Sequence, residues 1–213
     1  MAGERREAQQ GREVVAVGLT GGIGAGKSTA LALFDGLGAL TISADRLVHE
    51  FYLRPDIAGE VGSHFGTTVL NGSGAVDRSR LAEAVRGRPD ELRWLEELVH
   101  PLVAGQIERT IEEASLGTVV VCEVPLLFES GYERLFDLVV TVEAGPEIRR
   151  LRSTHRFGID QFSELEDLQT SGERRMAGSD LVFFNEGGRS DLAAFVREAY
   201  KQAQGLLGGG GGR

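Results

Sequence analysis

The chain has 213 residues, of which 41% are hydrophobic and 26% charged, and its formal net charge is −9. This composition is that of an ordinary globular protein with one sizeable core, and no apolar run approaches the roughly 20 residues that a membrane helix needs. The negative charge argues against nonspecific nucleic-acid binding, because such binding depends on Lys and Arg neutralising phosphates. We therefore expect a cytoplasmic enzyme with neither membrane nor nucleic-acid partners. Composition leaves the oligomeric state open, and a monomer is the working expectation.

The chain is expected to begin with a disordered leader at residues 1–12, which are polar and lack the apolar core of a signal peptide. A strand is predicted at residues 14–17 and a helix at residues 28–37. Between them residues 21–28 read Gly-Gly-Ile-Gly-Ala-Gly-Lys-Ser, which fits G-x-x-x-x-G-K-[ST]. A strand, a glycine loop and a helix in this order predict a cradle for the phosphates of a nucleoside triphosphate.

The cradle motif assigns roles to its side chains. Glycines let several backbone N–H groups point at phosphate oxygens, Lys27 would reach the β and γ phosphates, and the Ser28 hydroxyl would bind Mg²⁺. The alternative is a glycine-rich turn that matches the motif by chance. The predicted ATP-binding residues of this segment are Gly22, Ile23, Gly24, Ala25, Gly26, Lys27, Ser28 and Thr29.

A second strand is predicted at residues 40–42, followed by a helix that starts near Ala44. Asp45 follows this strand directly, so we expect it at the carboxyl end of the sheet, where parallel sheets bind ligands. Phosphoryl transfer to an alcohol needs a carboxylate that accepts or orients the hydroxyl proton, and Asp45 is the candidate. The alternative is an acid at a helix N-terminus that the helix dipole stabilises.

Residues 46–116 carry mostly helical patterns and exceed an ordinary crossover, which predicts an inserted helical subdomain for the second substrate. Within it, residues 71–74 are predicted to form a turn, and Pro101 is predicted to begin another helix.

Three further strands and a last helix complete the predicted core. Glu123 directly follows the third strand, at residues 118–122, and is expected to hold a metal ion through water. The alternative is a solvated acid at a strand end. The single cysteine, Cys122, is expected to be a buried structural thiol. Strands alternating with helices predict an α/β fold with a parallel sheet. The strands are at residues 118–122, 138–142 and 181–184, the helix is at 191–207, and a flexible glycine tail follows at 208–213.

Arginines gather at two places late in the chain, and we interpret both groups as local positive charge for a polyphosphate. They are Arg149, Arg150, Arg152 and Arg156, and then Arg174 and Arg175.

Five motifs together resemble the dephospho-CoA kinase family, and their order and spacing hold over residues 14–200. The motifs are the glycine loop within 17–29, Ile-Ser-Ala-Asp at 42–45, His100-Pro101, Val-Pro-Leu-Leu-Phe-Glu at 124–129 and Ser-Asp-Leu-Val-Phe-Phe-Asn at 179–185. The resemblance implies ATP- and Mg²⁺-dependent phosphorylation of the ribose 3′-hydroxyl of dephospho-CoA, which gives CoA and ADP.

The resemblance also implies a P-loop fold like that of nucleoside monophosphate kinases, with a five-stranded parallel sheet, a helical acceptor-binding insertion and a helical lid. The nucleotide core would comprise residues 13–45 and 117–207, the acceptor subdomain 46–116 and the lid 150–178.

By the same resemblance, Asp45 is the base or hydroxyl-orienting group and Lys27 the phosphate clamp. Arg156 would reach the transferring phosphate from the lid, and Asn185 would approach the adenine; a surface arginine and a turn asparagine are the alternatives. The implied acceptor-binding residues are Asp45, His100, Pro101, Leu126, Leu127, Phe128 and Glu129, and the implied metal residues are Ser28 and Glu123.

Two segments depart from the family pattern. Ser43 replaces the first acid of the usual D-A-D, and the usual R-x-x-x-Q followed by E-K becomes residues 163–169, which end at Gln169 without the arginine, and then Glu173-Arg174.

Two other functions stay open at this point. The first is another small-molecule kinase of the nucleoside monophosphate type, which leaves His100-Pro101 and residues 124–129 unexplained. The second is a noncatalytic nucleotide-binding relative. A GTPase is disfavoured because the sequence has no N-K-x-D motif.

Overall fold

The computed structural model describes residues 13–157, 166 and 169–208, with the side chains of 154–157 excepted. The predicted leader and the tail beyond Gly208 lie outside the described residues. The chain divides into two compact units, the first formed by Met1–Ser43 with Glu108–Arg213 and the second by Ala44–Ile107. Among the helices described, none is long and apolar enough to cross a bilayer.

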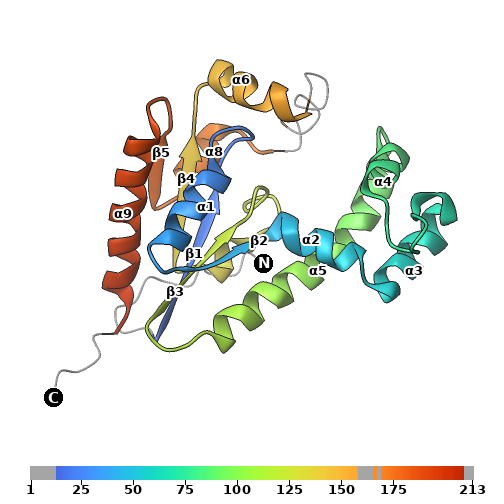
Figure 1. Ribbon diagram of the computed structural model, residues 1–213, viewed down its shortest axis with the longest axis horizontal. Coiled ribbons are helices and arrows are strands. Elements are labelled where there is room, and N and C mark those ends of the chain that lie inside the picture. Colours follow the sequence, from blue (N-terminus) through green and yellow to red (C-terminus); the bar gives the residue numbers. More distant parts are fainter. Residues whose placement is uncertain (1–12, 158–165, 167–168, 209–213) are drawn as a thin grey trace. The chain divides into compact units, whose positions relative to one another are not determined.

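The first unit is built on a five-stranded sheet in the order β2-β3-β1-β4-β5, with every pair of neighbours parallel (Figure 1). The five-stranded parallel sheet expected from the sequence is therefore confirmed. The central strands are buried on both faces, which explains their continuous runs of β-branched residues. The strands are β1 Val14–Thr20, β2 Leu40–Ser43, β3 Thr118–Glu123, β4 Leu138–Glu143 and β5 Leu181–Phe184.

Helices α1 and α9 pack together in the core of the first unit, side by side in Figure 1. Phe34 of α1 and Val196 of α9 are fully buried with the apolar side chains of β1. This packing fixes the start of α1, and hence the glycine loop before it. The helices of this unit are α1 Lys27–Gly36, η2 Tyr132–Leu135, α6 Pro146–Phe157, α8 Gly172–Ala177 and α9 Arg189–Leu206.

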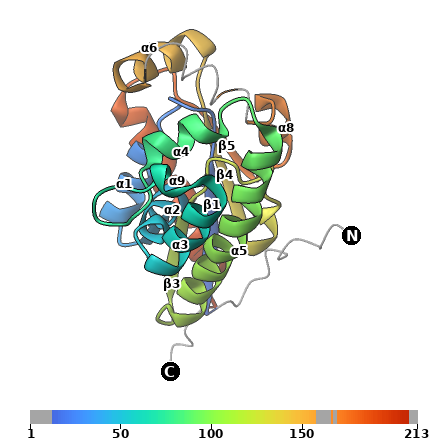
Figure 2. The same ribbon diagram turned by 90° about the vertical axis from the view of Figure 1, so that its right-hand side faces the viewer.

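The second unit is helical (Figure 2). The Phe65 ring of α3 lies edge-on to the Trp94 ring near the start of α5, with centroids 5.5 Å apart. The predicted turn at residues 71–74 is confirmed, since Asn71 Oδ1 accepts a hydrogen bond from the Ser73 N–H. The helices are α2 Ala44–Tyr52, α3 Pro55–Phe65, η1 Thr67–Val69, α4 Arg78–Val85 and α5 Pro89–Glu113, which continues into the first unit.

Pro101 lies inside α5, so the prediction that it begins a helix is wrong. Proline removes one backbone hydrogen bond from a helix, an intrinsic cost of about 3 kcal/mol. The buried side chains of Val99, Val103 and Ile107 recur along the helix on both sides of Pro101. Their packing holds the helix continuous through a residue whose local preference is to begin one.

Candidate active site

The glycine loop between β1 and α1 adopts a backbone that only glycine tolerates. Gly21, Gly24 and Gly26 have φ angles of 144°, 76° and 112°. A Cβ atom on Gly21 would lie 1.9 Å from the Val142 carbonyl oxygen of β4, and one on Gly26 would lie 2.5 Å from the Asn185 amide nitrogen. The loop backbone therefore lies in close contact with β4 on one side and with the residue that follows β5 on the other.

Lys27 begins α1 and folds back over the loop. Its Nζ atom donates hydrogen bonds to the carbonyl oxygens of Gly21, at 2.9 Å, and Gly22, at 3.1 Å, and the residue is only 9% exposed. Ser28 and Thr29, which follow it in the first turn of α1, are exposed. An ammonium group, a helix N-terminus and a glycine loop thus meet at one place, which suits an anion.

Ser28 and Glu123 form the candidate metal pair. The Ser28 hydroxyl donates to Glu123 Oε1 at 3.1 Å, although the two residues come from α1 and the end of β3. Hydroxyl and carboxylate oxygens are the ligand types that Mg²⁺ prefers, and Mg²⁺ in kinases is held by few protein ligands together with phosphates. Among the described residues, no group of three or more His, Cys, Asp or Glu side chains could hold a metal ion.

Cys122 lies beside this pair but is wholly buried. Burial raises the pKa of the Cys122 thiol, and the neighbouring Glu123 carboxylate raises it further. Because the thiolate is the reactive form, this residue is a structural thiol, as expected.

Asn185 follows β5 and closes the loop from the other side. Its Nδ2 atom donates to the Ala25 carbonyl oxygen at 2.7 Å, and its own carbonyl oxygen accepts from Arg152 Nη1 at 3.1 Å. Asn185 therefore contacts the predicted ATP-binding loop through its side-chain amide. Its approach to the adenine stays a prediction.

Gln169 contacts the loop as well, although the sequence motifs assign it no role. Its Oε1 atom accepts from the Ile23 N–H at 2.9 Å, and its Nε2 atom donates to the carbonyl oxygens of Gly21, at 3.2 Å, and Pro125, at 2.9 Å. The only signal for it in the sequence was its place at the end of the divergent R-x-x-x-Q segment, because an uncharged amide has no distinctive pattern of its own.

The segment after β3, residues 124–129, was predicted to border the acceptor. Leu127 is fully buried next to Gly18, so its side chain belongs to the core. Phe128 lies against Gly178, and Glu129 accepts a hydrogen bond from the Thr170 N–H. Leu126 and Pro125 are half-buried. Contact of any of these side chains with an acceptor stays a prediction.

Two members of the arginine groups that were interpreted as a polyphosphate site form ion pairs within the protein. Arg175 is buried and pairs with the buried Glu143, with Nε and Oε1 2.7 Å apart, so its charge serves an internal ion pair. Arg149 pairs with Glu166 at 2.6 Å. Arg156 belongs to α6, and its side chain lies outside the described part of the chain. The polyphosphate role of the two arginine groups stays a prediction.

Three predicted site residues belong to the second unit. Asp45 is exposed in the first turn of α2, directly after β2, whose last residue Ser43 is in register with Glu123. His100, half-buried, and Pro101, exposed, lie in the middle of α5. The roles of all three stay predictions.

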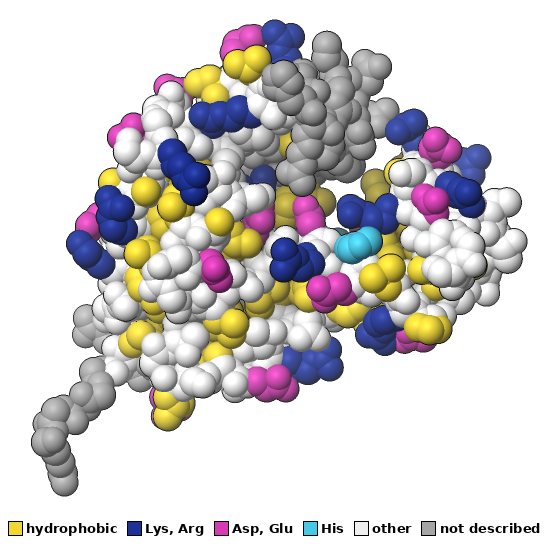
Figure 3. All heavy atoms as spheres, viewed as in Figure 1, with side chains coloured by type: hydrophobic (Ala, Val, Ile, Leu, Met, Phe, Trp, Pro, Cys, Tyr) yellow, Lys and Arg dark blue, Asp and Glu magenta, His cyan; other side chains and the backbone are white. Residues whose placement is uncertain are grey.

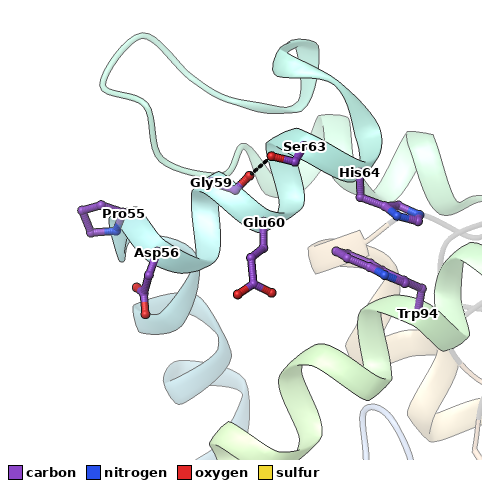
Figure 4. A pocket seen from close by; sticks show the side chains of 7 residues that line it. All are labelled: Pro55, Asp56, Gly59, Glu60, Ser63, His64 and Trp94. Atoms are coloured by element: carbon purple, nitrogen blue, oxygen red, sulfur yellow. Dashed lines mark hydrogen bonds between the residues drawn. The ribbon is translucent and has the colours of Figure 1, made fainter.

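A separate open depression of about 600 Å³ lies in the second unit, between α3 and the start of α5 (Figure 4). The His64 ring stacks on Trp94 with centroids 3.9 Å apart, and His64 Nε2 lies 2.6 Å from Glu91 Oε2. None of the predicted site residues lines this depression. Its lining residues are Pro55, Asp56, Gly59, Glu60, Ser63, His64 and Trp94.

Among the described side chains on the face drawn in Figure 3, basic groups lie next to acidic ones.

Comparisons with known proteins converge on one family. A family profile described as dephospho-CoA kinase matches residues 15–191. The dephospho-CoA kinase of Streptomyces avermitilis is 39% identical over 188 residues, which cover 86% of this chain and 91% of the relative. That of Shewanella oneidensis is 34% identical over 190 residues, which cover 87% and 92%.

Solved structures agree with the fold. A Thermus thermophilus protein, TT1252, is similar with a TM-score of 0.75 and 30% identity, over 90% of this chain and 98% of that one. A dephospho-CoA kinase from Campylobacter jejuni has a TM-score of 0.62 and 21% identity over the same shares, a likeness that concerns the fold alone.

Proposed function

Because the chain belongs to the dephospho-CoA kinase family, we propose that it transfers the γ-phosphoryl group of ATP to the ribose 3′-hydroxyl of dephospho-CoA, giving CoA and ADP. The observation that carries the proposal is the arrangement at the start of α1, where Lys27 lies on the glycine loop and Ser28 pairs with Glu123. An anion site and a pair of hard oxygen ligands adjoin each other there, as Mg²⁺-ATP requires.

The loop residues bind and orient the triphosphate. Backbone N–H groups of the loop and of the first turn of α1 donate to phosphate oxygens, apart from those of Ile23 and Ala25, which are paired with Gln169 and Gly22; the positive end of the α1 dipole lies behind them. The Lys27 ammonium lies over the loop and compensates the charge that develops on the β and γ phosphates during transfer.

Ser28 and Glu123 are the residues that would hold Mg²⁺, the hydroxyl directly and the carboxylate through water. When bound, Mg²⁺ would supply positive charge that offsets the negative charge of the triphosphate. Glu123 is 7% exposed, and a metal ion at this place would compensate the cost of burying its charge.

Asp45 orients the 3′-hydroxyl of the acceptor and takes its proton as the bond to phosphorus forms. Its place directly after β2, beside the strand that ends in Glu123, supports this role. The transfer is direct and in line, with no phosphoenzyme. The helical unit Ala44–Ile107, with His100 and Pro101, and the segment 124–129 bind the acceptor, and Arg156 in the lid contacts the transferring phosphate.

The experiment that tests the proposal measures ADP formation by the purified protein with Mg²⁺-ATP and, in turn, dephospho-CoA, AMP, CMP or no acceptor. Product mass identifies the phosphorylated species. Phosphorylation of dephospho-CoA alone is the expected result. Transfer to AMP or CMP would instead support the alternative of a nucleotide kinase, and ATP binding without transfer would support a noncatalytic relative. We expect the active species to be a cytoplasmic monomer, and sedimentation of the purified protein tests the monomer.

A further inference from the structure

The carbonyl oxygen of Gly21 accepts hydrogen bonds from two side chains of different parts of the chain. Lys27 Nζ donates to it at 2.9 Å and Gln169 Nε2 at 3.2 Å. Gly21 is buried and its conformation is fixed by the contact with β4. The two donors therefore share one rigid acceptor, and the position of each depends on the orientation of that carbonyl group.

Gln169 also fixes the next peptide unit of the loop, because its Oε1 atom accepts from the Ile23 N–H at 2.9 Å. The same amide group thus holds a carbonyl and an N–H of one short loop. Such a bidentate contact opposes rotation about the φ and ψ bonds of Gly22, which joins the two peptide units, and it keeps the loop in one shape before a nucleotide arrives.

The third hydrogen bond of Gln169 leads away from the loop, to the Pro125 carbonyl oxygen at 2.9 Å. Its neighbour Thr170 donates to Glu129, at the other end of the same segment. Residues 169 and 170 are in turn anchored by Arg175, which donates to the Thr170 carbonyl oxygen and pairs with the buried Glu143. The nucleotide loop and the segment 125–129 are therefore joined through one glutamine.

We propose that Gln169 is a positioning residue of the kinase reaction. It holds the Gly21 carbonyl that orients Lys27, and it couples the nucleotide loop to the segment after β3. This inference rests on the proposed function for the same site, but it makes a prediction about nucleotide binding that does not depend on which acceptor is used.

Two substitutions separate the parts of this role. Gln169→Met keeps the length of the side chain and removes its hydrogen bonds. Gln169→Glu keeps an acceptor for the Ile23 N–H, loses both donors and adds a negative charge beside the phosphate site. Gln202→Met, on the exposed surface of α9, is the matched control.

The readouts are direct calorimetric binding of ATP and ADP without acceptor, the separate KM and kcat values, and the melting temperature. Gln169→Met is expected to bind ATP about tenfold more weakly, since two hydrogen bonds to the loop and one to Pro125 are lost, and to lower kcat by a similar factor. Gln169→Glu is expected to bind ATP about a hundredfold more weakly because of charge repulsion. The control should bind ATP as the wild type does.

The melting temperature distinguishes positioning from simple structural support. Lower affinity and kcat with a melting temperature within a few degrees of wild type supports the proposal. Unchanged ATP affinity in Gln169→Met, equal affinity in the Met and Glu variants, or loss of folding in both would overturn it. A wild-type protein that binds ATP but makes no CoA would overturn the proposed function instead, and the binding data would still decide the role of Gln169.

Discussion

Replacing Gly21 by alanine tests how tightly the nucleotide loop is built into the sheet. The new residue would have to adopt a φ of 144°, which costs a side-chain-bearing residue about 1–3 kcal/mol. Its Cβ atom would also lie 1.9 Å from the Val142 carbonyl oxygen, which is backbone of β4 in the middle of the sheet and cannot rotate away as a side chain could. Relieving that overlap costs about 1–3 kcal/mol more.

Together these effects predict a loss of about 2–6 kcal/mol in the free energy of unfolding, a large part of the 5–15 kcal/mol typical of a domain. Two other glycines provide a scale. Gly22 has an ordinary φ, and a Cβ there would meet mainly the movable side chains of Arg149 and Glu143, so Gly22→Ala should cost about 1 kcal/mol. Gly36 has no atom within 4 Å of its would-be Cβ, and Gly36→Ala should be stabilising by about 0.4–1 kcal/mol.

Urea unfolding at 25 °C, followed by circular dichroism, measures all three variants against the wild type. The expected order of stability is Gly36→Ala, wild type, Gly22→Ala, Gly21→Ala. A Gly21→Ala protein within 1 kcal/mol of wild type would refute the reasoning, because it would mean that the loop can move off β4 at little cost. We expect the Gly21→Ala protein to lose ATP binding, measured by calorimetry. If the loop can move off β4 at little cost, the variant should instead bind ATP nearly as the wild type does.

Four further outcomes are expected. Asp45→Asn should lower kcat by about a hundredfold or more while ATP affinity and melting temperature stay unchanged. The control Asp90→Asn, on the exposed start of α5, should behave as wild type. An unchanged kcat in Asp45→Asn would remove Asp45 from the mechanism. Lys27→Ala should weaken ATP binding and turnover together, and normal kinetics would contradict the phosphate cradle. Glu123→Gln should raise the Mg²⁺ concentration needed for half-maximal rate by about tenfold, measured by Mg²⁺ titration at saturating ATP, and an unchanged titration curve would exclude Glu123 as a metal residue. Desolvation on burial raises the pKa of Tyr52 to about 12, and the Arg78 charge offsets this only in part. The folded state therefore holds the Tyr52 proton more strongly than the unfolded state does, so the stability due to this group is full below pH 10 and falls by about 2–3 kcal/mol as the pH rises to 12. Tyr52→Phe should not show this loss in alkaline unfolding curves.

The sheet and the nucleotide loop could be predicted from the sequence because their signals are local. Continuous apolar runs such as Val119–Cys122 are typical of strands buried on both faces, and the residue types of the loop follow directly from the geometry it needs. The structure extends β1 to Thr20, three residues beyond the predicted end, because these residues pair with β4, and that pairing is not visible in the chain.

The parts that could not be predicted depend on distant partners. The buried ion pair of Arg175 could not be predicted, because its partner Glu143 is far away in the sequence. Gln169 has no recognisable pattern of its own, and its three bonds reach Gly21, Ile23 and Pro125. The prediction that Pro101 begins a helix is wrong for the opposite reason. Proline does favour the first turn of a helix, but the packing of α5 overrides this local preference.

Cys122 offers a practical route to observing this enzyme at work. It is the only cysteine of the chain, it is wholly buried in β3, and burial raises the pKa of its thiol. Maleimide reagents react with thiolates, so the native chain should stay unlabelled under conditions in which an introduced surface cysteine reacts. One cysteine placed at Arg88 in the helical unit and one at Lys201 on α9 could carry a fluorophore pair without removing any native residue of the nucleotide loop. Energy transfer between the two dyes would then report in real time whether the two units move as each substrate binds.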